Sequence, residues 1–250
     1  GGLPCDMDPL LSIAERYGLS IVEDAAHAFP SQLPDGRWAG TIGDLGVFSF
    51  YATKTITTGE GGMVVGRNQA LMDRIAVMRL HGIDRAAWNR YSDPRASWYY
   101  EIIGPGFKYN MPDILAAIGR VQLGRARSLL AEREALARRY DEAFKDEAGL
   151  ILPPTGPGNA RHLYPLRLER AAGRDAAIRA LKEAGIGVSV HFIPLHTMPY
   201  YRNRYGLEEE DFPASMDSFR RVISLPLWPG MGEVRVERVI KTVKAVIHGR

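Results

Sequence analysis

Residues 43–62 read GDLGVFSFYATKTITTGEGG, an apolar run bounded by glycines that contains one lysine, Lys54. Lys54 is the only charged residue between Asp44 and Glu60. An ammonium in apolar surroundings loses hydration, which lowers its pKa and leaves more of the amine free to attack a carbonyl. The alternative is a buried lysine that pairs with Asp24 or Glu60. The run therefore predicts either a catalytic amine or an internal ion pair.

Short apolar segments alternate with amphipathic ones on both sides of Lys54. We expect helices at 6–17 and 68–80 and strands at 20–23, 46–51 and 62–65. Short, predominantly apolar strands that alternate with helices are typical of an α/β fold whose mostly parallel sheet is covered on both faces. Asn68 is a suitable N-cap for the second helix.

Asp24 follows the first expected strand, within the sequence VEDAAHA at 22–28. In open α/β sheets, ligands bind beyond the carboxyl ends of the strands. An acid at such a position can keep the ring nitrogen of a cofactor protonated. The alternative is an aspartate that caps the start of a following helix.

The second half of the chain differs in composition. We expect one long helix from Pro112 to about Phe144, with the proline and an acid in its first turn. Residues 149–160 are rich in proline and glycine, which indicates a linker. Beyond the linker we expect strands at 162–168, 188–190 and 223–225 and helices at 175–184 and from 233. This order predicts a large domain at 1–148 and a small α+β domain at 149–250.

Composition excludes several classes of protein. The formal net charge is +3 and the isoelectric point is about 9.0, but the basic residues are spread along the chain, so no nucleic-acid surface is expected. No apolar stretch is long enough to cross a membrane, and no membrane partner is expected. Cys5 is the only cysteine, which rules out an internal disulfide and favours a cytoplasmic location.

Several motifs, in order along nearly the whole chain, resemble the DegT/DnrJ/EryC1/StrS family of sugar aminotransferases, which are fold-type-I enzymes dependent on pyridoxal 5'-phosphate (PLP). They are VEDAAHA at 22–28, GDLGVFSF at 43–50, Lys54 with GEGG at 59–62, RLHG at 79–82, GFKYNM at 106–111, AAIG at 116–119, GIG at 185–187, HFIPLH at 191–196 and SLPL at 224–227.

The resemblance implies a role for each of four residues. Lys54 is the Schiff-base lysine and moves the proton at the substrate carbon. Asp24 binds the pyridinium nitrogen, and His27 donates to the ring's 3' oxygen. Ser49 donates its hydroxyl to the cofactor phosphate. Relatives that act as dehydratases have histidine at the lysine position, so Lys54 favours transamination.

The resemblance also implies a homodimer with its site at the subunit interface. The segment 108–110 then reaches the cofactor phosphate of the partner subunit. Many relatives have Asn-Tyr-Arg where this chain has Lys108, Tyr109 and Asn110. Either Lys108 or Asn110 can make that contact; we assign it to Asn110 and place Lys108 among the substrate-binding candidates. The apolar and aromatic composition of 99–111 suits a buried interface.

Two further histidines, His191 and His196, belong to a loop that lines the sugar pocket in the family. Substrate contact and ordinary packing are both open for them. They are separated by Pro194 and have no neighbouring cluster of carboxylates or thiols, so no metal site is expected.

The family's glycine-rich phosphate turn and its ring-stacking aromatic have no counterpart before Asp24. We therefore expect the chain to lack the N-terminal part of the family's large domain. The resemblance implies amino transfer from glutamate to a nucleotide-linked keto sugar, with the 4-keto position favoured over the 3-keto, in polysaccharide, lipopolysaccharide or antibiotic biosynthesis. The alternatives are a non-catalytic module that keeps the fold, or an inactive fragment of the enzyme.

Overall fold

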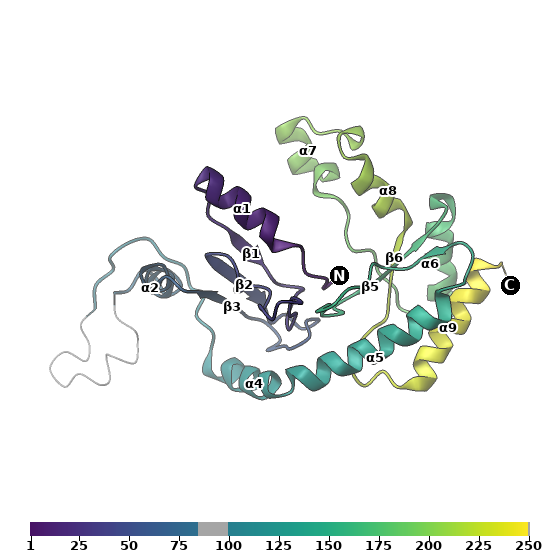
Figure 1. The fold of residues 1–250 in the computed structure, drawn as a ribbon, viewed down its shortest axis with the longest axis horizontal. Helices are drawn as coiled ribbons and strands as arrows, with labels where there is room; N and C mark the ends of the chain where they lie inside the picture. Colours follow the sequence, from purple (N-terminus) through teal and green to yellow (C-terminus); the bar gives the residue numbers. More distant parts are fainter. Residues whose placement is uncertain (85–99, 250) are drawn as a thin grey trace. The chain divides into compact units, whose positions relative to one another are not determined.

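A computed structural model describes residues 1–84 and 100–249, and the chain divides into two compact units (Figure 1). The first unit is Pro4–Ala126. The second, here called the C-terminal unit, combines Arg127–Arg250 with Gly1–Leu3.

The boundary between the units lies at the start of α5 (Ala126–Phe144), between Ala126 and Arg127, whereas the sequence predicts a domain boundary after this helix, between residues 148 and 149. Tyr140 and Phe144 of α5 are fully buried in the core of the C-terminal unit. Because aromatic side chains of this size contribute much of the stability of a core, α5 belongs to the unit that buries them.

Five elements of the first unit are those that the apolar pattern predicts, with ends shifted by one or two residues. They are α1 (Met7–Tyr17), β1 (Val22–Asp24), β2 (Leu45–Ser49), β3 (Gly62–Gly66) and α2 (Gln69–Met78). The sixth element, α4 (Asp113–Gly124), is shorter than the helix that the sequence predicts. Asn68 caps α2 as expected, since its side chain accepts a hydrogen bond from the Leu71 amide at 3.2 Å.

The sheet of the first unit has the order β1-β2-β3 and is mixed. β1 runs parallel to β2, with Asp24 opposite Val47, whereas β3 runs antiparallel to β2, with Gly62 opposite Ser49. Since paired residues share a face and side chains alternate along a strand, Asp24, Val47 and Ser49 lie on the same face. This common face carries the residues of the candidate site.

The long helix expected from Pro112 to Phe144 is interrupted. α4 ends at Gly124, Arg125 lies between the helices with φ −99° and ψ −3°, and α5 begins at Ala126. Glycine is a poor helix former because its backbone loses more conformational freedom than that of any other residue. The interruption falls directly after Gly124, a residue with low helix propensity.

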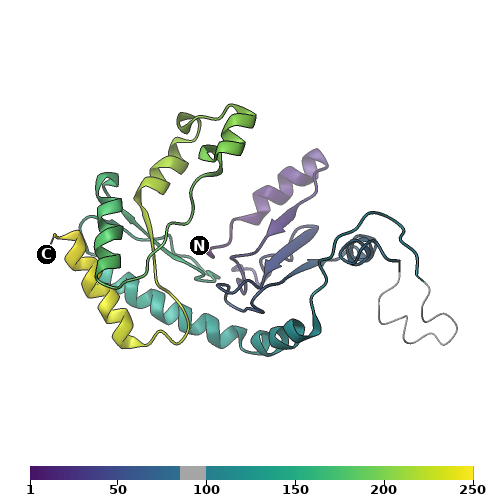
Figure 2. The ribbon, with the colours of Figure 1, turned by 180° about the vertical axis from the view of Figure 1, so that it is seen from behind.

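The C-terminal unit places a small antiparallel sheet, with the order β4-β5-β6, among helices. Its elements are α5, β4 (Leu150–Ile151), β5 (Tyr164–Leu168), η1 (Ala171–Gly173), α6 (Arg174–Glu183), η2 (Leu195–Thr197), α7 (Pro199–Tyr205), η3 (Glu209–Asp211), α8 (Pro213–Arg221), β6 (Val222–Leu225) and α9 (Glu233–Ile247). In Figure 1 and Figure 2, α8 lies on the opposite side of this sheet from α5 and α9.

Alternation along β5 separates the two faces of the small sheet. Tyr164, Leu166 and Leu168 are buried in the core with α5, α6 and α9, whereas Pro165 and Arg167 face the other way and are half-buried. The Tyr164 hydroxyl donates to Asp141 Oδ1 at 2.9 Å, so the polar group of this buried tyrosine is satisfied.

The strand expected at 188–190 is reduced to one bridge. Ser189 and Ser224 exchange backbone hydrogen bonds of 3.3 and 2.8 Å, and the pairing does not extend further. Gly187 precedes this segment and Pro194 follows the loop after it. Glycine and proline both disfavour a continuous strand, which limits the pairing.

Candidate active site

The two neighbouring carboxylates of β1, Glu23 and Asp24, lie on opposite faces of the sheet. Glu23 accepts hydrogen bonds from the backbone amides of Gly40, Ile42 and Gly43 at 2.6–2.7 Å. A carboxylate that receives three amide hydrogen bonds fixes the loop before β2. Glu23 is therefore structural, a role that the motif by itself does not reveal.

Gly46 on β2 allows this loop to lie close to the strand. A side-chain carbon at Gly46 would lie 1.8 Å from the carbonyl oxygen of Gly40, far inside any permitted contact. Any larger residue at this position would displace the loop that Glu23 holds.

Asp24 ends β1 with its side chain exposed. Its Oδ1 accepts a hydrogen bond from the Ala26 amide at 3.1 Å, and the Ala25 amide donates to the carbonyl of Val47 at 2.9 Å. A turn, and not a helix, follows the strand, so Asp24 is not a helix N-cap. The carboxylate is held by the turn but remains accessible to a ligand.

Lys54 lies in the loop between β2 and β3, which is closed by its own hydrogen bonds. The Lys54 amide donates to the Tyr51 carbonyl at 3.0 Å, and the Thr58 amide donates to the Phe50 carbonyl at 2.9 Å. Thr57 Oγ1 also donates to the Phe50 carbonyl, at 3.1 Å. These bonds fix the backbone on both sides of the lysine.

Partial burial lowers the pKa of the Lys54 ammonium below the ordinary lysine value, and the negative charge of Asp24 opposes part of this shift. Asp24 is thus near enough to act electrostatically on the lysine, although no ion pair joins Lys54 to Asp24 or to Glu60. The internal ion pair that the sequence left open is not formed. A partly desolvated amine near an exposed carboxylate suits a site that binds a carbonyl group.

Ser49 ends β2 on the same face as Asp24. Its Oγ accepts a hydrogen bond from the Tyr51 amide at 3.3 Å, which leaves the hydroxyl proton available for donation. Val47 lies between Ser49 and Asp24 on this face, and 37% of its surface is exposed. Sequence reasoning missed Val47, because only the strand pairing shows an exposed apolar surface beside the two polar groups.

His27 lies in the turn after β1, half-buried, three residues beyond Asp24. Asp24, His27, Ser49 and Lys54 thus all belong to strand ends or adjoining turns of one sheet. This is the edge at which ligands bind in α/β proteins.

Lys108 and Asn110 belong to the same unit and contact each other, since Lys108 Nζ donates to Asn110 Oδ1. The two residues that the sequence offered as alternatives are therefore one hydrogen-bonded pair. Phe107 and Tyr109 beside them stack with ring centroids 4.9 Å apart, and both are exposed. Tyr99, the first residue of the expected interface segment, lies outside the described residues.

His191 and His196 lie in the C-terminal unit and differ in environment. The Nδ1 of His191 is 2.8 Å from Ser224 Oγ, and this histidine lines a cavity. His196 is buried and stacks on Phe212 with ring centroids 4.5 Å apart. Within the described ranges 1–84 and 100–249, no group of three metal-binding side chains is found and no helix is long and apolar enough to span a membrane.

The sequence model of the DegT/DnrJ/EryC1/StrS aminotransferase family matches residues 1–244. The chain belongs to this family. The resemblance carried by the motifs is confirmed, and so is the fold-type-I architecture, of which the chain forms a part.

Proteins similar to this chain include the spore coat polysaccharide biosynthesis protein SpsC of Bacillus subtilis, 47% identical over 255 residues that cover 100% of the chain and 65% of SpsC. PseC of Helicobacter pylori, an aminotransferase involved in the biosynthesis of pseudoaminic acid, is 25% identical with a TM-score of 0.91, and the match covers 100% of this chain and 65% of PseC. The chain thus spans about two thirds of the length of such relatives.

Spr1654 of Streptococcus pneumoniae, to which the function of a sugar aminotransferase has been assigned, is 31% identical with a TM-score of 0.90, over 99% of this chain and 67% of Spr1654. Its solved structures include a PLP form. PLP is the cofactor of the family, and the groups gathered at this sheet edge suit it. Asp24 is an exposed carboxylate held by the Ala26 amide, Lys54 has a lowered pKa, and Ser49 has an available hydroxyl proton.

Proposed function

We propose that the full-length protein transfers an amino group from glutamate to a nucleotide-linked keto sugar, with the 4-keto position favoured, in polysaccharide biosynthesis. Membership of a sugar aminotransferase family supports the class of reaction. SpsC and PseC, which are named for polysaccharide and sugar biosynthesis, support the choice of pathway. The observation that carries the proposal is the partly buried Lys54 with its lowered pKa near the exposed Asp24. We place the reaction in the cytoplasm.

Each residue at the sheet edge has a proposed role. PLP, when bound, supplies an electron sink for the substrate carbon. Asp24 binds the ring nitrogen and keeps it protonated, His27 donates to the ring oxygen, and Ser49 donates to the phosphate. Lys54 holds the cofactor through Nζ and carries the proton at the substrate carbon. Because burial lowers its pKa, more of the Lys54 amine is neutral near pH 7 than for an exposed lysine.

Borohydride reduction of the cofactor-loaded, full-length protein tests the assignment of Lys54. We expect the reduced cofactor to map to Lys54 by peptide mass spectrometry, and Lys54→Arg to abolish the label. Lys182→Arg, on α6, is the control that should leave it unchanged. A label on another lysine would show the assignment to be wrong.

A panel of 3-keto and 4-keto sugar nucleotides, assayed with glutamate, tests the reaction itself. The result expected is formation of the amino sugar with loss of glutamate. A protein that binds PLP but converts no keto sugar would instead be the non-catalytic module that the sequence left open.

We also propose a homodimer in which Asn110 reaches the cofactor phosphate of the partner subunit. The segment that carries Lys108 and Asn110 also carries exposed apolar residues, among them Ile102 and Ile103, exposed by 66% and 64%. Apolar surface of this extent is typical of an interface. Since Lys108 occupies Asn110 Oδ1, the Asn110 amide group is left to donate to the phosphate.

Mixed dimers test this contact. Asn110→Ala should weaken cofactor binding by about 1–3 kcal/mol. When it is mixed with Lys54→Ala, one site of each mixed dimer carries both changes and the other carries neither, so activity should partly return. Subunit exchange is confirmed first with differently tagged subunits. No recovery after exchange would place Asn110 outside the partner's site.

A further inference from the structure

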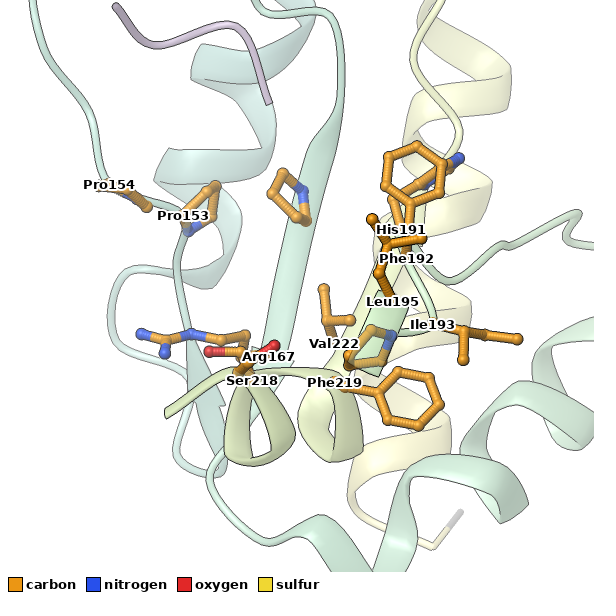
Figure 3. A pocket seen from close by; sticks show the side chains of 13 residues that line it. Pro153, Pro154, Arg167, His191, Phe192, Ile193, Leu195, Ser218, Phe219 and Val222 are labelled. Atoms are coloured by element: carbon orange, nitrogen blue, oxygen red, sulfur yellow. The ribbon is translucent and has the colours of Figure 1, made fainter. Parts of the chain in front are cut away.

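The C-terminal unit contains a cavity of about 490 Å³ on the face of its sheet that points away from the hydrophobic core (Figure 3). Pro165 and Arg167 of β5 form part of its lining, because alternation along the strand directs them away from the core residues Tyr164 and Leu166. Helix α8 and the loop before η2 form most of the rest. The cavity thus belongs entirely to one unit.

The lining combines an extensive apolar surface with a few polar groups. The apolar residues are Pro153, Pro154, Pro165, Phe192, Ile193, Pro194, Leu195, Phe219 and Val222. The polar ones are Arg167, His191, Ser215 and Ser218, and none of the described residues that line the cavity is acidic. A predominantly apolar cleft with a small convergent polar set is the usual composition of a small-molecule site.

Arg167 is the cation of this set, and its guanidinium forms no ion pair with any residue in the described part of the chain. The neighbouring arginines of α8 are paired, Arg220 with Glu209 at 2.5 Å and Arg221 with Asp217 at 2.6 Å. Arg167 is half-buried in the cavity wall. A guanidinium presents several donors in a fixed planar array, which suits the oxygens of a carboxylate or phosphate.

Ser215 and Ser218 lie one helical turn apart on α8, so their side chains occupy the same side of the helix and both line the cavity. Their hydroxyl groups supply neutral donors from a second element beside β5. The donors therefore come from two elements, α8 and β5, and all three side chains line the same cavity.

From this arrangement we propose that the cavity binds a small organic oxyanion, with Arg167 and the two serines as donors and the prolines and phenylalanines in contact with its apolar part. A volume of about 490 Å³ is within the range of ligand pockets and exceeds the need of a lone ion. The absence of acidic residues from the lining makes it unsuited to a cation.

Two sources of the oxyanion are compatible with this chemistry, a nucleoside diphosphate and the carboxylate of an amino donor. The choice of these two rests on the proposed function, but the binding itself does not depend on turnover. Uridine diphosphate, pyrophosphate and glutarate serve as probes that separate them. Glutarate carries the carboxylates of a glutamate but has no amine to react.

The experiment uses the full-length, cofactor-loaded protein, so that the cofactor's own phosphate site is filled. Calorimetry measures the affinity of each probe, and modification of arginines by phenylglyoxal, mapped by mass spectrometry, locates its binding. We expect a bound probe to protect Arg167, and Arg167→Gln to weaken binding by about 10- to 100-fold. Replacing both serines by alanine should weaken it several-fold.

Arg170→Gln is the matched control, since Arg170 is exposed beyond the end of β5 and does not line the cavity. It should bind the probes as the wild type does. Arg167→Lys keeps the positive charge but loses the planar array of donors. This variant should bind the probes with an affinity between those of the wild type and Arg167→Gln, and it provides a second test if Arg167→Gln does not fold.

The outcome identifies the source of the oxyanion. If uridine diphosphate binds, glutarate does not, and the binding depends on Arg167, the oxyanion is a nucleotide phosphate. If uridine diphosphate also binds with higher affinity than pyrophosphate, the apolar lining contributes to the affinity. Binding of glutarate alone indicates a carboxylate. If no probe protects Arg167 and no affinity changes on its substitution, the proposal is wrong. A protein that converts no keto sugar but protects Arg167 would disprove the proposed function and support this site.

Discussion

The two units of the chain differ in where their apolar residues lie. In the C-terminal unit, side chains from α5, α6, α9 and the sheet meet in one continuous buried core. In the first unit, the buried cluster around Met7, Leu33 and Ile42 is small, whereas Val22 on β1 is 60% exposed. The unit that carries the proposed catalytic residues is thus the one with the smaller buried core among the described residues.

This contrast indicates that chemistry and stability depend on different units. A substitution at the sheet edge of the first unit should change the reaction and leave folding nearly unaffected. A substitution in the core of the C-terminal unit should do the opposite. Buried apolar residues contribute through transfer from water and through packing, whereas an exposed polar residue contributes little to either.

The largest effect is expected at Asp24. Asp24→Ala should lower the rate of transamination by several orders of magnitude, because the cofactor ring loses the partner that makes it an electron sink. The free energy of unfolding should change by less than about 0.5 kcal/mol, because the side chain is exposed. Single-turnover kinetics and urea denaturation measure the two quantities.

Glu23→Gln is the control for this prediction. It removes the negative charge that holds the loop before β2, so it should destabilise the first unit by about 1.5–3 kcal/mol. A near wild-type rate for Asp24→Ala would show that another acid serves the ring nitrogen, and the contrast between the two faces of β1 would fail.

The next effect concerns the core. Leu166→Ala should reduce the free energy of unfolding of the C-terminal unit by about 2–5 kcal/mol, since Leu166 is 2% exposed and its removal leaves a cavity. Met63→Ala on β3 is the counterpart in the first unit, where the side chain is 53% exposed, and should change stability by less than about 0.5 kcal/mol.

Hydrogen–deuterium exchange in increasing urea, followed on peptides from each unit, measures these changes separately. Comparable destabilisation by the two substitutions would show that the Met63 side chain is buried in the protein in solution. The contrast in burial between the two units would then fail.

The smallest effect is expected at Glu147, which joins the ends of α5 and α9. Its carboxylate accepts from Lys244 Nζ at 2.8 Å and pairs with His248 at 2.5 Å, and these two partners lower its pKa. A carboxyl group with a lower pKa in the folded state stabilises the protein above its unfolded pKa. This contribution is lost as the pH falls through the folded pKa.

Glu147→Gln should therefore be less stable than the wild type near pH 7, and the difference should shrink as the pH falls below the ordinary range of a glutamate. Thermal unfolding at a series of pH values provides the measurement. A constant difference at all pH values would show that packing, and not the charge, is responsible.

Much of the fold follows from local patterns. The helix 7–17, the strand at 62–66 and the N-cap at Asn68 were predictable because apolar periodicity and capping residues act over a few positions. The interruption at Arg125 and the loss of the strand at 188–190 were not predicted. The first depends on how a helix with a weak position packs, and the second on which neighbouring strand offers a partner.

For the candidate site, the amino-acid sequence was sufficient to select Lys54 and Asp24, because a lone lysine in an apolar run and an acid after an apolar strand are visible as residue types at short spacing. The family motifs around them determined the cofactor. The roles of Glu23, Val47 and Arg167 were not visible in this way. Each depends on which face of a strand a side chain occupies and on what lies opposite it. Strand pairing and packing between residues far apart in the chain create those surroundings, so only the folded structure reveals them.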